Sequence, residues 1–362
     1  SLGSLIEAEQ PYGQSYQNST IIMIPCRMEE QNTNIQLSLN EQDQIQGLFF
    51  KPYKSQKKAA KAPDGVKERE VELQIADGKK LSGRLTTPAE GKSFPLVILL
   101  AGSGPNDMDE TIYDNKPFQD IAWGLAKKGI ASYRYDKRTY TYPESFTVKD
   151  TVEQEVIFDA VAAFSQMKQQ KQIDTNKIYI LGHSLSGYLI PRIAAEMDGC
   201  AGYIMMAAPA RALDELLMEQ VTYLAKLDGN ITKDEQAAID QYKQDQQDLQ
   251  RIDELSDAKI FFGGMSKAYM KDLLSYDAVQ QAADIKVPVL CAQGLRDYQV
   301  TEEDQAIWRK NFETHKNWIF TTYPNATHLM IDGEGTPTNE EYKTKGHVNQ
   351  AFIEDMASFI KK

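Results

Sequence analysis

Three side chains with complementary chemistry occur along the chain in the order Ser184, Asp297 and His328. Each stands just after a short apolar segment, within KIYILGHS, VPVLCAQGLRD and NWIFTTYPNATH respectively. A serine hydroxyl is a weak nucleophile that needs a base to remove its proton. An imidazole can act as that base, and a carboxylate can orient the imidazole and stabilise its protonated form. These residues therefore predict nucleophilic catalysis at Ser184.

The residues around Ser184 are typical of a sharp turn between a strand and a helix. In LGHSLSG, Gly182 and Gly187 leave room where a side chain would collide with the turn. Ser186 stands where the usual G-x-S-x-G pattern has its last glycine. Because serine is small and Gly187 follows at once, we expect a working turn with slightly different packing. The alternative, that Ser184 merely caps a helix, is disfavoured by Asp297 and His328 following in order.

The base can be chosen by elimination, since the chain has four histidines. His183 lies inside the turn, and we expect its side chain to point away from Ser184. His315 precedes the last core strand, at the opposite end of the sheet, and His347 is expected to begin the C-terminal helix. Both are assigned structural or capping roles. Only His328 follows the last strand, where a base can reach the serine.

Asp297 is separated from His328 by 31 residues, which is enough chain for one helix and one strand. Its rivals are Asp107, Asp109 and Asp136. Asp136 follows an earlier strand, and the other two lie in the loop after PLVILLAG. We expect all three to be structural or substrate-side carboxylates.

A tetrahedral intermediate needs hydrogen-bond donors for its oxyanion. The amide of Leu185, directly after the nucleophile, is expected to be one donor. The second is expected to be the amide of Ser103, with Gly102 permitting the turn. The alternative for AGSGP is an ordinary glycine-rich turn. It is not a phosphate-binding loop, because no GK[ST] follows.

Short apolar segments alternating with helical patterns indicate a mostly parallel sheet with helices on both faces, an α/β fold. In such sheets functional residues gather at the carboxyl ends of the strands. Period-2 patterning over residues 19–52 predicts a small antiparallel β meander, and residues 53–68 are interpreted as a linker. The expected division has a β-rich segment with linker at 1–60, a core at 61–210 and 286–362, and a helical cap at 211–285.

Composition and charge limit the classes of partner that the protein can bind. The chain has 362 residues and a formal net charge of -12, which disfavours nucleic acid and anionic membranes. Its longest apolar run, residues 95–102, is too short to span a bilayer. The three cysteines have no metal-binding or disulfide spacing. The first residue is serine rather than methionine, so both a cytoplasmic location and export after removal of a leader are considered.

Three stretches carry a resemblance to a known family. They are GSGPNDMDE at 102–110, YDKR at 135–138 and GLRDYQV at 294–300. The chain resembles the α/β-hydrolase superfamily, and more narrowly the bacterial serine esterases with a GSGPxDRDE loop. The resemblance implies carboxylic-ester hydrolysis, a cap between the sixth and seventh strands, and a small N-terminal domain. No metal or organic cofactor is implied. Met108 replaces the usual arginine of that loop.

The leading hypothesis is a serine carboxylesterase acting on a small-molecule ester. The alternatives are a peptidase, or an acyl-CoA thioesterase or acyltransferase, with the same Ser-His-Asp triad. A non-catalytic binding protein is disfavoured because the triad is whole. The sequence assigns no substrate-binding residue and leaves the oligomeric state open. Several apolar residues of the cap fit an acyl pocket and the core of the cap equally well: Phe261, Phe262, Met265, Tyr269 and Met270.

Overall fold

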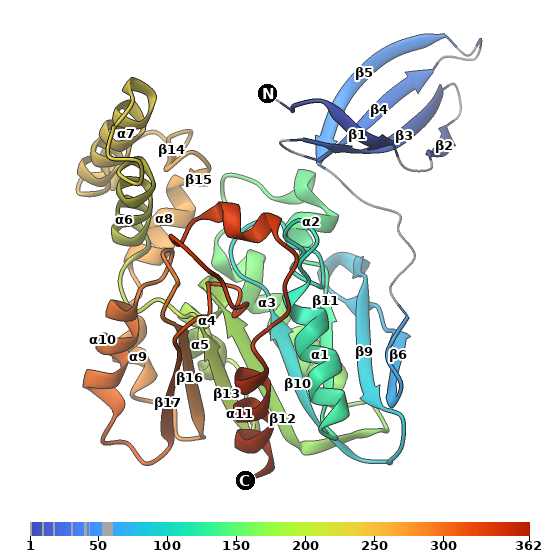
Figure 1. Ribbon diagram of the computed structural model, residues 1–362, viewed down its shortest axis with the longest axis vertical. Coiled ribbons are helices and arrows are strands. Elements are labelled where there is room, and N and C mark those ends of the chain that lie inside the picture. Colours follow the sequence, from blue (N-terminus) through green and yellow to red (C-terminus); the bar gives the residue numbers. More distant parts are fainter. Residues whose placement is uncertain are drawn as a thin grey trace. The chain divides into compact units, whose positions relative to one another are not determined.

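The computed structural model describes residues 2–8, 11–16, 19–29, 32–39, 42, 44–52 and 61–362. The chain divides into two compact units, Ser1–Lys61 and Ala62–Lys362 (Figure 1). The smaller unit is a β-sheet, and the larger unit is a layered α/β structure.

The smaller unit is a five-stranded antiparallel sheet. Its strands are β1 (Leu5–Ala8), β2 (Tyr12–Tyr16), β3 (Ser19–Met28), β4 (Thr33–Leu39) and β5 (Ile45–Pro52). The predicted meander is present as β3, β4 and β5, which pair in succession. The sequence reading missed β1 and β2, which both pair with β3. Both are short, and neither LIEA nor YGQSY offers a clear alternation of apolar and polar residues.

The larger unit is built on an eight-stranded sheet in the order β17-β16-β13-β12-β10-β11-β9-β6. Neighbours from β17 to β11 are parallel, whereas β9 is antiparallel to both β11 and β6. This confirms the predicted mostly parallel sheet. The strands are β6 (Val66–Glu70), β9 (Gly83–Pro88), β10 (Phe94–Leu100), β11 (Ala131–Tyr135), β12 (Ile173–His183), β13 (Gly202–Met206), β16 (Val289–Gly294) and β17 (Trp318–Tyr323).

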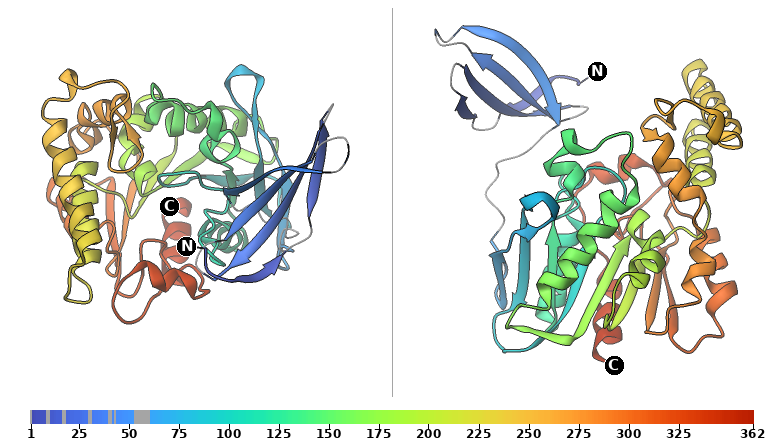
Figure 2. Two further views of the ribbon diagram at one scale, coloured as in Figure 1. Left: turned by 90° about the horizontal axis from the view of Figure 1, so that it is seen from above. Right: turned by 180° about the vertical axis from the view of Figure 1, so that it is seen from behind.

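The central strands are apolar throughout because helices cover both faces of the sheet. Along β10, Leu96 and Ile98 belong to one core cluster, whereas Val97 and Leu99 belong to the other. The covering helices are α1 (Pro117–Lys127), α3 (Phe158–Met167), α5 (Ile190–Ala195), α9 (Ala278–Ala282), α10 (Glu302–Phe312) and α11 (Gln350–Lys361). Figures 1 and 2 show α1 and α11 on one face and α3 and α5 on the other.

The linker prediction is wrong at its C-terminal end. Residues 53–60 lie outside the described residues, but 66–68 open the edge strand β6. Only Val66 of this strand is buried. Charged side chains on an edge strand are common because they discourage pairing with other chains. The charged stretch therefore lacks the apolar alternation by which a strand is predicted. The next segment forms a short hairpin, in which β7 (Leu73–Gln74) pairs with β8 (Lys80–Leu81).

A helical insertion separates β13 from β16, the sixth and seventh strands of this sheet in chain order. It contains α6 (Leu213–Ala225), α7 (Lys233–Leu249), β14 (Ile260–Phe261), β15 (Met265–Ser266) and α8 (Lys267–Leu274). A capping box between Thr232 and Glu235 begins α7. Phe261, Phe262 and Met270 are buried in a cluster of the insertion itself. Packing within the insertion therefore accounts for these three side chains.

The loop after β10 is fastened to the sheet by buried charges. Arg134 of β11 is fully buried, and its Nε donates to Asp109 Oδ1 at 2.7 Å. Its Nη2 pairs with Glu68 of β6 at 2.9 Å. Removing one member of such a network leaves an uncompensated buried charge, which is strongly destabilising. Asp109 is therefore a structural carboxylate.

Within the described residues, no helix has both the length and the apolar character needed to cross a bilayer.

Candidate active site

Ser184 occupies a strained turn between β12 and the short helix α4 (Leu185–Tyr188). Its backbone has φ 51° and ψ −117°, a conformation that L residues adopt rarely and at an energetic cost. The amide of Ser184 donates to the carbonyl of Met206 in β13 at 3.0 Å. Such a turn lifts a serine hydroxyl out of the end of a sheet, as in the nucleophile elbow of hydrolases.

The glycines around Ser184 are required by close packing. A side chain at Gly182 would run into the backbone carbonyl of Ser186. A Cβ at Gly187 would lie 2.7 Å from Cβ of Ala208. Real Cβ atoms do not approach so closely, so both positions need glycine for steric reasons.

Ser186 is fully buried, and its hydroxyl donates to the carbonyl of Ala101 at 2.5 Å. Ala101 directly follows β10. The serine at the position of the usual glycine thus ties the elbow to the start of the neighbouring loop. Its hydroxyl is occupied by a structural bond.

We expect Ser186→Gly to keep catalytic activity within a few-fold of the parent. Losing one buried hydrogen bond costs roughly 1–2 kcal/mol of stability, so the melting temperature falls modestly. Steady-state hydrolysis and thermal unfolding measure the two effects. A folded Ser186→Gly protein without activity would mean that Ser186 takes part in the chemistry.

Asp297 and His328 are brought into contact at the carboxyl ends of β16 and β17. Nδ1 of His328 lies 2.6 Å from Oδ2 of Asp297, and both residues are buried. A carboxylate accepts hydrogen bonds, so this contact places the proton of a neutral ring on Nδ1 and leaves Nε2 free to accept one. No hydrogen bond joins Ser184 Oγ to His328 among the described residues. Such bonds commonly tighten only when substrate binds.

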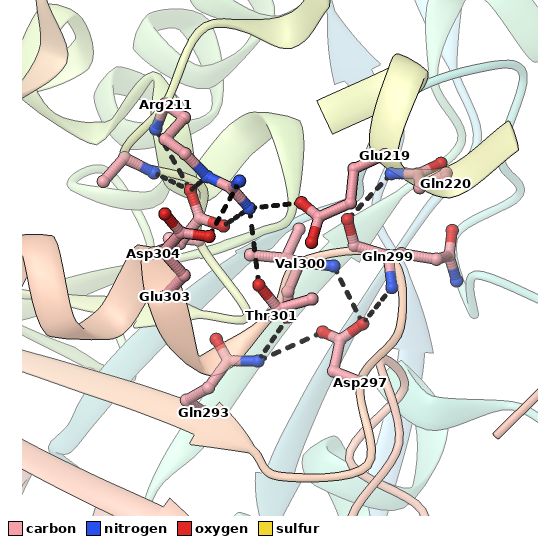
Figure 3. A network of polar contacts seen from close by, with 12 residues as sticks. Arg211, Glu219, Gln220, Gln293, Asp297, Gln299, Val300, Thr301, Glu303 and Asp304 are labelled. Carbon is pink, nitrogen blue, oxygen red and sulfur yellow. Dashed lines mark hydrogen bonds and ion pairs between the residues drawn. The ribbon is translucent and has the colours of Figure 1, made fainter. Parts of the chain in front are cut away.

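The Asp297 carboxylate is itself held rigidly (Figure 3). Oδ1 accepts from the amides of Gln299 at 2.8 Å and Val300 at 3.0 Å. Oδ2 accepts from Nε2 of Gln293 at 3.2 Å as well as facing His328. Hydrogen bonds from these three donors fix the direction of the carboxylate, so Asp297 can orient the imidazole.

The other two candidate carboxylates, Asp107 and Asp136, accept hydrogen bonds from residues of the loop after β10. Asp107 accepts from the hydroxyl of Thr111 at 2.7 Å. Asp136 accepts from the amide of Met108 at 2.7 Å. At Met108, where the GSGPxDRDE pattern has arginine, this contact is made by the backbone amide and therefore does not depend on an arginine side chain. Neither Asp107 nor Asp136 touches His328 in the contacts among described residues.

His183 is closer to the site than the sequence suggested. Its Nδ1 lies 2.8 Å from Oε1 of Glu110, and its Nε2 lies 2.9 Å from the carbonyl oxygen of His328. A carbonyl only accepts, so Nε2 carries a proton. The ring therefore links the loop after β10 to the backbone of the His328 loop. The sequence offered no signal for this partner, because Glu110 and His183 are 73 residues apart.

The contacts of His183 favour the protonated form of its ring. Burial by itself lowers the pKa of an imidazole. Here burial is outweighed by the carboxylate of Glu110, the carbonyl of His328 and the charge of Asp297, so the pKa of His183 is raised. Glu110 Oε1 also accepts from the amide of Gly102 at 2.7 Å. One buried carboxylate thus holds both the elbow and the Gly102 loop.

The other predicted histidines lie elsewhere. His315 follows α10 in the turn before β17, as expected. His347 lies before α11, whose N-cap is Asn349, so the prediction that His347 begins the helix is slightly wrong. Its Nδ1 contacts Asp120 at 3.1 Å, and its side chain is 75% exposed.

The expected oxyanion donors, Ser103 and Leu185, have no acceptor for their amides among the described residues. The loop that carries Ser103 passes close to the nucleophile, because a Cβ on Gly102 would lie 3.2 Å from Cβ of Ser184. Leu185 is the first residue of α4. Amides without intramolecular partners beside a strained serine are suited to stabilising a developing negative charge.

The described residues contain no cluster of three or more His, Cys, Asp or Glu side chains arranged to hold a metal ion. The three cysteines, Cys26, Cys200 and Cys291, are buried and unpaired. Burial raises the pKa of Cys200 to about 11 and that of Cys291 to about 12, which suppresses thiolate formation at neutral pH.

The strand order of the sheet, the helices that connect its parallel strands and the serine-bearing turn define an α/β-hydrolase. The chain belongs to the serine aminopeptidase S33 family, whose model matches residues 115–335. Esterase EstD of Thermotoga maritima is 39% identical over 328 residues, which cover 90% of this chain and 76% of the relative. The protein is accordingly a serine ester hydrolase, an enzyme of the carboxylesterase type.

Two solved structures illustrate the shared fold. Est1E from Butyrivibrio proteoclasticus, with ferulic acid bound, has a TM-score of 0.53 and 19% identity, covering 81% of this chain and 100% of that one. The Pyrococcus furiosus esterase Pf2001 has a TM-score of 0.52 and 18% identity, covering 82% and 92%. At these identities the likeness concerns the fold alone.

Proposed function

We propose that this enzyme hydrolyses small or medium acyl esters through an acyl-enzyme on Ser184, with His328 as base and Asp297 as its orienting partner. The observation that carries the proposal is the 2.6 Å contact between buried Asp297 and His328, at the same sheet end as the strained Ser184. That combination supplies a nucleophile and a base with a defined tautomer.

In the first half-reaction, Ser184 Oγ attacks the ester carbonyl carbon while its proton passes to Nε2 of His328. The carbonyl oxygen becomes an oxyanion, and the amides of Leu185 and Ser103 stabilise it. The C–O bond to the alcohol then breaks as His328 returns the proton to the leaving oxygen. The acyl group remains on Ser184 as an ester.

In the second half-reaction, His328 takes a proton from water as the water oxygen attacks the acyl carbon. The same two amides stabilise the second oxyanion. Collapse of this intermediate breaks the bond to Ser184 Oγ, which recovers a proton from His328. The products are a carboxylic acid and an alcohol, and the enzyme returns to its starting state.

A peptidase is the second candidate, because the matched family is described as serine aminopeptidase. The same triad can cleave an amide, but the proton from His328 must then reach a leaving nitrogen. Acyl-CoA thioesters are disfavoured as substrates because the net charge of -12 repels a polyanionic cofactor.

Hydrolysis of p-nitrophenyl acetate, an aminoacyl p-nitroanilide and an acyl-CoA by the same preparation separates these activities. We expect the largest kcat/KM for the ester. A larger kcat/KM for the anilide would identify a peptidase, and one for the thioester would identify a thioesterase; either result would overturn the ester assignment. Ser184→Ala is the background control for all three substrates.

Residues 211–285 are proposed to act as a cap over the Ser184 pocket. Support comes from α6, where Nε2 of Gln220 donates to the carbonyl of Gln299 at 2.8 Å. The ring of Tyr223 stacks on that of Tyr298, with centroids 5.6 Å apart. Both partners directly follow Asp297. The start of the insertion is pinned by Arg211, which donates to Asp304 of α10 at 2.8 Å (Figure 3).

We expect backbone amides of α6 and α7 to exchange with deuterium faster than those of the central sheet, because lids open on their own. Hydrogen exchange followed by mass spectrometry measures this directly. An inhibitor bound covalently to Ser184 should slow exchange in α6. Unchanged exchange in α6, with the inhibitor bound, would argue against a covering role.

A further inference from the structure

A buried lysine lies behind the oxyanion loop. Lys137 follows β11 and is only 4% exposed. Its ammonium donates to the carbonyl oxygen of Gly102 at 2.6 Å and pairs with Oε1 of Glu155 at 2.5 Å. Lysine is almost never fully buried unless it is paired, because removing its charge from water is expensive. The protein therefore places the Lys137 ammonium, whose burial is energetically unfavourable, against the peptide group that joins Gly102 to Ser103.

That peptide group carries the amide of Ser103, since it joins the Gly102 carbonyl to the Ser103 nitrogen. It is trans, as are the other peptide bonds of the described residues. In a planar trans peptide the C=O and N–H point in opposite directions. Holding the Gly102 oxygen on Lys137 thus aims the Ser103 N–H the other way. Asn106 also donates to this oxygen, but at 3.2 Å.

The ammonium of Lys137 affects the strength of the Ser103 N–H as a hydrogen-bond donor as well as its direction. A charged donor forms a stronger hydrogen bond than a neutral one. It also polarises the peptide, and cooperative strengthening along such a chain amounts to roughly 10–30% per bond. The Ser103 N–H consequently becomes a better donor for a negatively charged oxygen.

Glu155 completes the arrangement by contacting both Lys137 and the loop. Its Oε1 accepts from the amide of Gly104 at 3.3 Å as well as from Lys137. Its Oε2 accepts from the hydroxyl of Tyr269 at 2.6 Å. Glu155 lies in a π-helical turn, Glu153–Ile157, which directly precedes α3. Such turns are frequent at functional sites.

We propose that Lys137, neutralised by Glu155, is a positioning residue that aims and polarises the Ser103 amide toward the oxyanion of the reaction. The inference rests on the proposed function, because it presupposes that Ser103 stabilises an oxyanion. It adds a pair of residues that touch neither the ester nor Ser184 in the proposed mechanism. Both act through the loop backbone.

The decisive experiment compares p-nitrophenyl acetate with p-nitrophenyl thionoacetate, in which sulfur replaces the carbonyl oxygen. Sulfur is a weak hydrogen-bond acceptor, so oxyanion donors favour the oxygen ester. Lys137→Met is expected to lower kcat/KM for the oxygen ester by about 10- to 100-fold, because removing an oxyanion donor costs about 10²- to 10³-fold. The thionoester is expected to lose much less, so the ratio of the two falls.

A role in folding alone would lower both rates together and leave their ratio unchanged, which would overturn the inference. Unaltered hydrolysis of the oxygen ester would overturn it too. The matched control is Lys168→Met. Lys168 directly follows α3, and its ammonium donates to the carbonyl of Asp198, so this variant removes another lysine-to-carbonyl bond. It should change neither rate.

Should Lys137→Met fail to fold, Glu155→Gln keeps the shape of the partner and removes only its charge. We expect this variant to shift the ester ratio in the same direction by a smaller factor, and an unchanged ratio would again reject the inference. Ser184→Ala distinguishes the two levels of failure. If it is inactive while Lys137→Met behaves like the parent, only the role of Lys137 is wrong. If it is active, the proposed function itself is wrong.

Discussion

Replacing Ser184 by alanine is expected to reduce kcat for ester hydrolysis by roughly 10⁶-fold, because the acyl group then has no oxygen to bond to. The fold should survive, since the residue is only partly buried and alanine is smaller. The strained backbone, with φ 51°, is kept in either protein, and its cost is borne by the surrounding packing. Initial rates on p-nitrophenyl acetate and circular dichroism measure the two properties.

The same serine can be tested chemically. A fluorophosphonate probe should label the parent once, and peptide mapping should locate the label at Ser184. Ser186, two residues away, is a stringent internal control because its hydroxyl is buried and donates to Ala101. Label on Ser186, or undiminished labelling of Ser184→Ala, would contradict the assignment of the nucleophile.

Replacing His328 by alanine is expected to cost about 10⁴-fold or more in turnover, since no other base then accepts the proton of Ser184. Asp297→Asn should be severely impaired yet somewhat less so, because the carboxylate acts only through the ring. Both proteins should remain folded, as both side chains lie at the ends of strands. Steady-state kinetics and thermal unfolding of the three proteins provide the comparison.

The assignment of His328 as the base can also be tested on the other histidines, because only an imidazole that reaches Ser184 can take its proton. His315→Ala and His347→Ala are suitable controls and should retain activity. His183 is not an equivalent control, because its ring bonds to the carbonyl of His328. Loss of turnover in either control while His328→Ala stays active would refute the assigned base.

Much of the architecture was accessible from local pattern. Runs such as PLVILLAG and KIYILGHS are apolar throughout because strands of a parallel sheet are covered on both faces, so their type and order could be predicted. Edge elements were harder. The strand β6 reads VKERE, and solvent on one side of it removes the apolar signal, so local pattern predicts a linker for part of it.

The candidate residues at strand ends were likewise readable from the sequence. Ser184, Asp297 and His328 each follow a strand of a sheet whose parallel order brings its carboxyl ends to one edge. The sequence also pointed to Ser103 and Leu185, because an oxyanion needs donors next to the nucleophile and in the neighbouring loop. These inferences need only the spacing of residues along the chain and the geometry common to such sheets.

By itself, then, the sequence determined the fold class, the elements of the central sheet and the residues that follow its strands. Only the tertiary structure decided how the groups behind the site are arranged. Glu110 meets His183 across 73 residues, and Lys137 meets Gly102 across 35. The physical reason is that hydrophobic periodicity reports burial but not partners. A buried charge must find its counter-charge or acceptor, and which one it finds depends on how distant loops pack together.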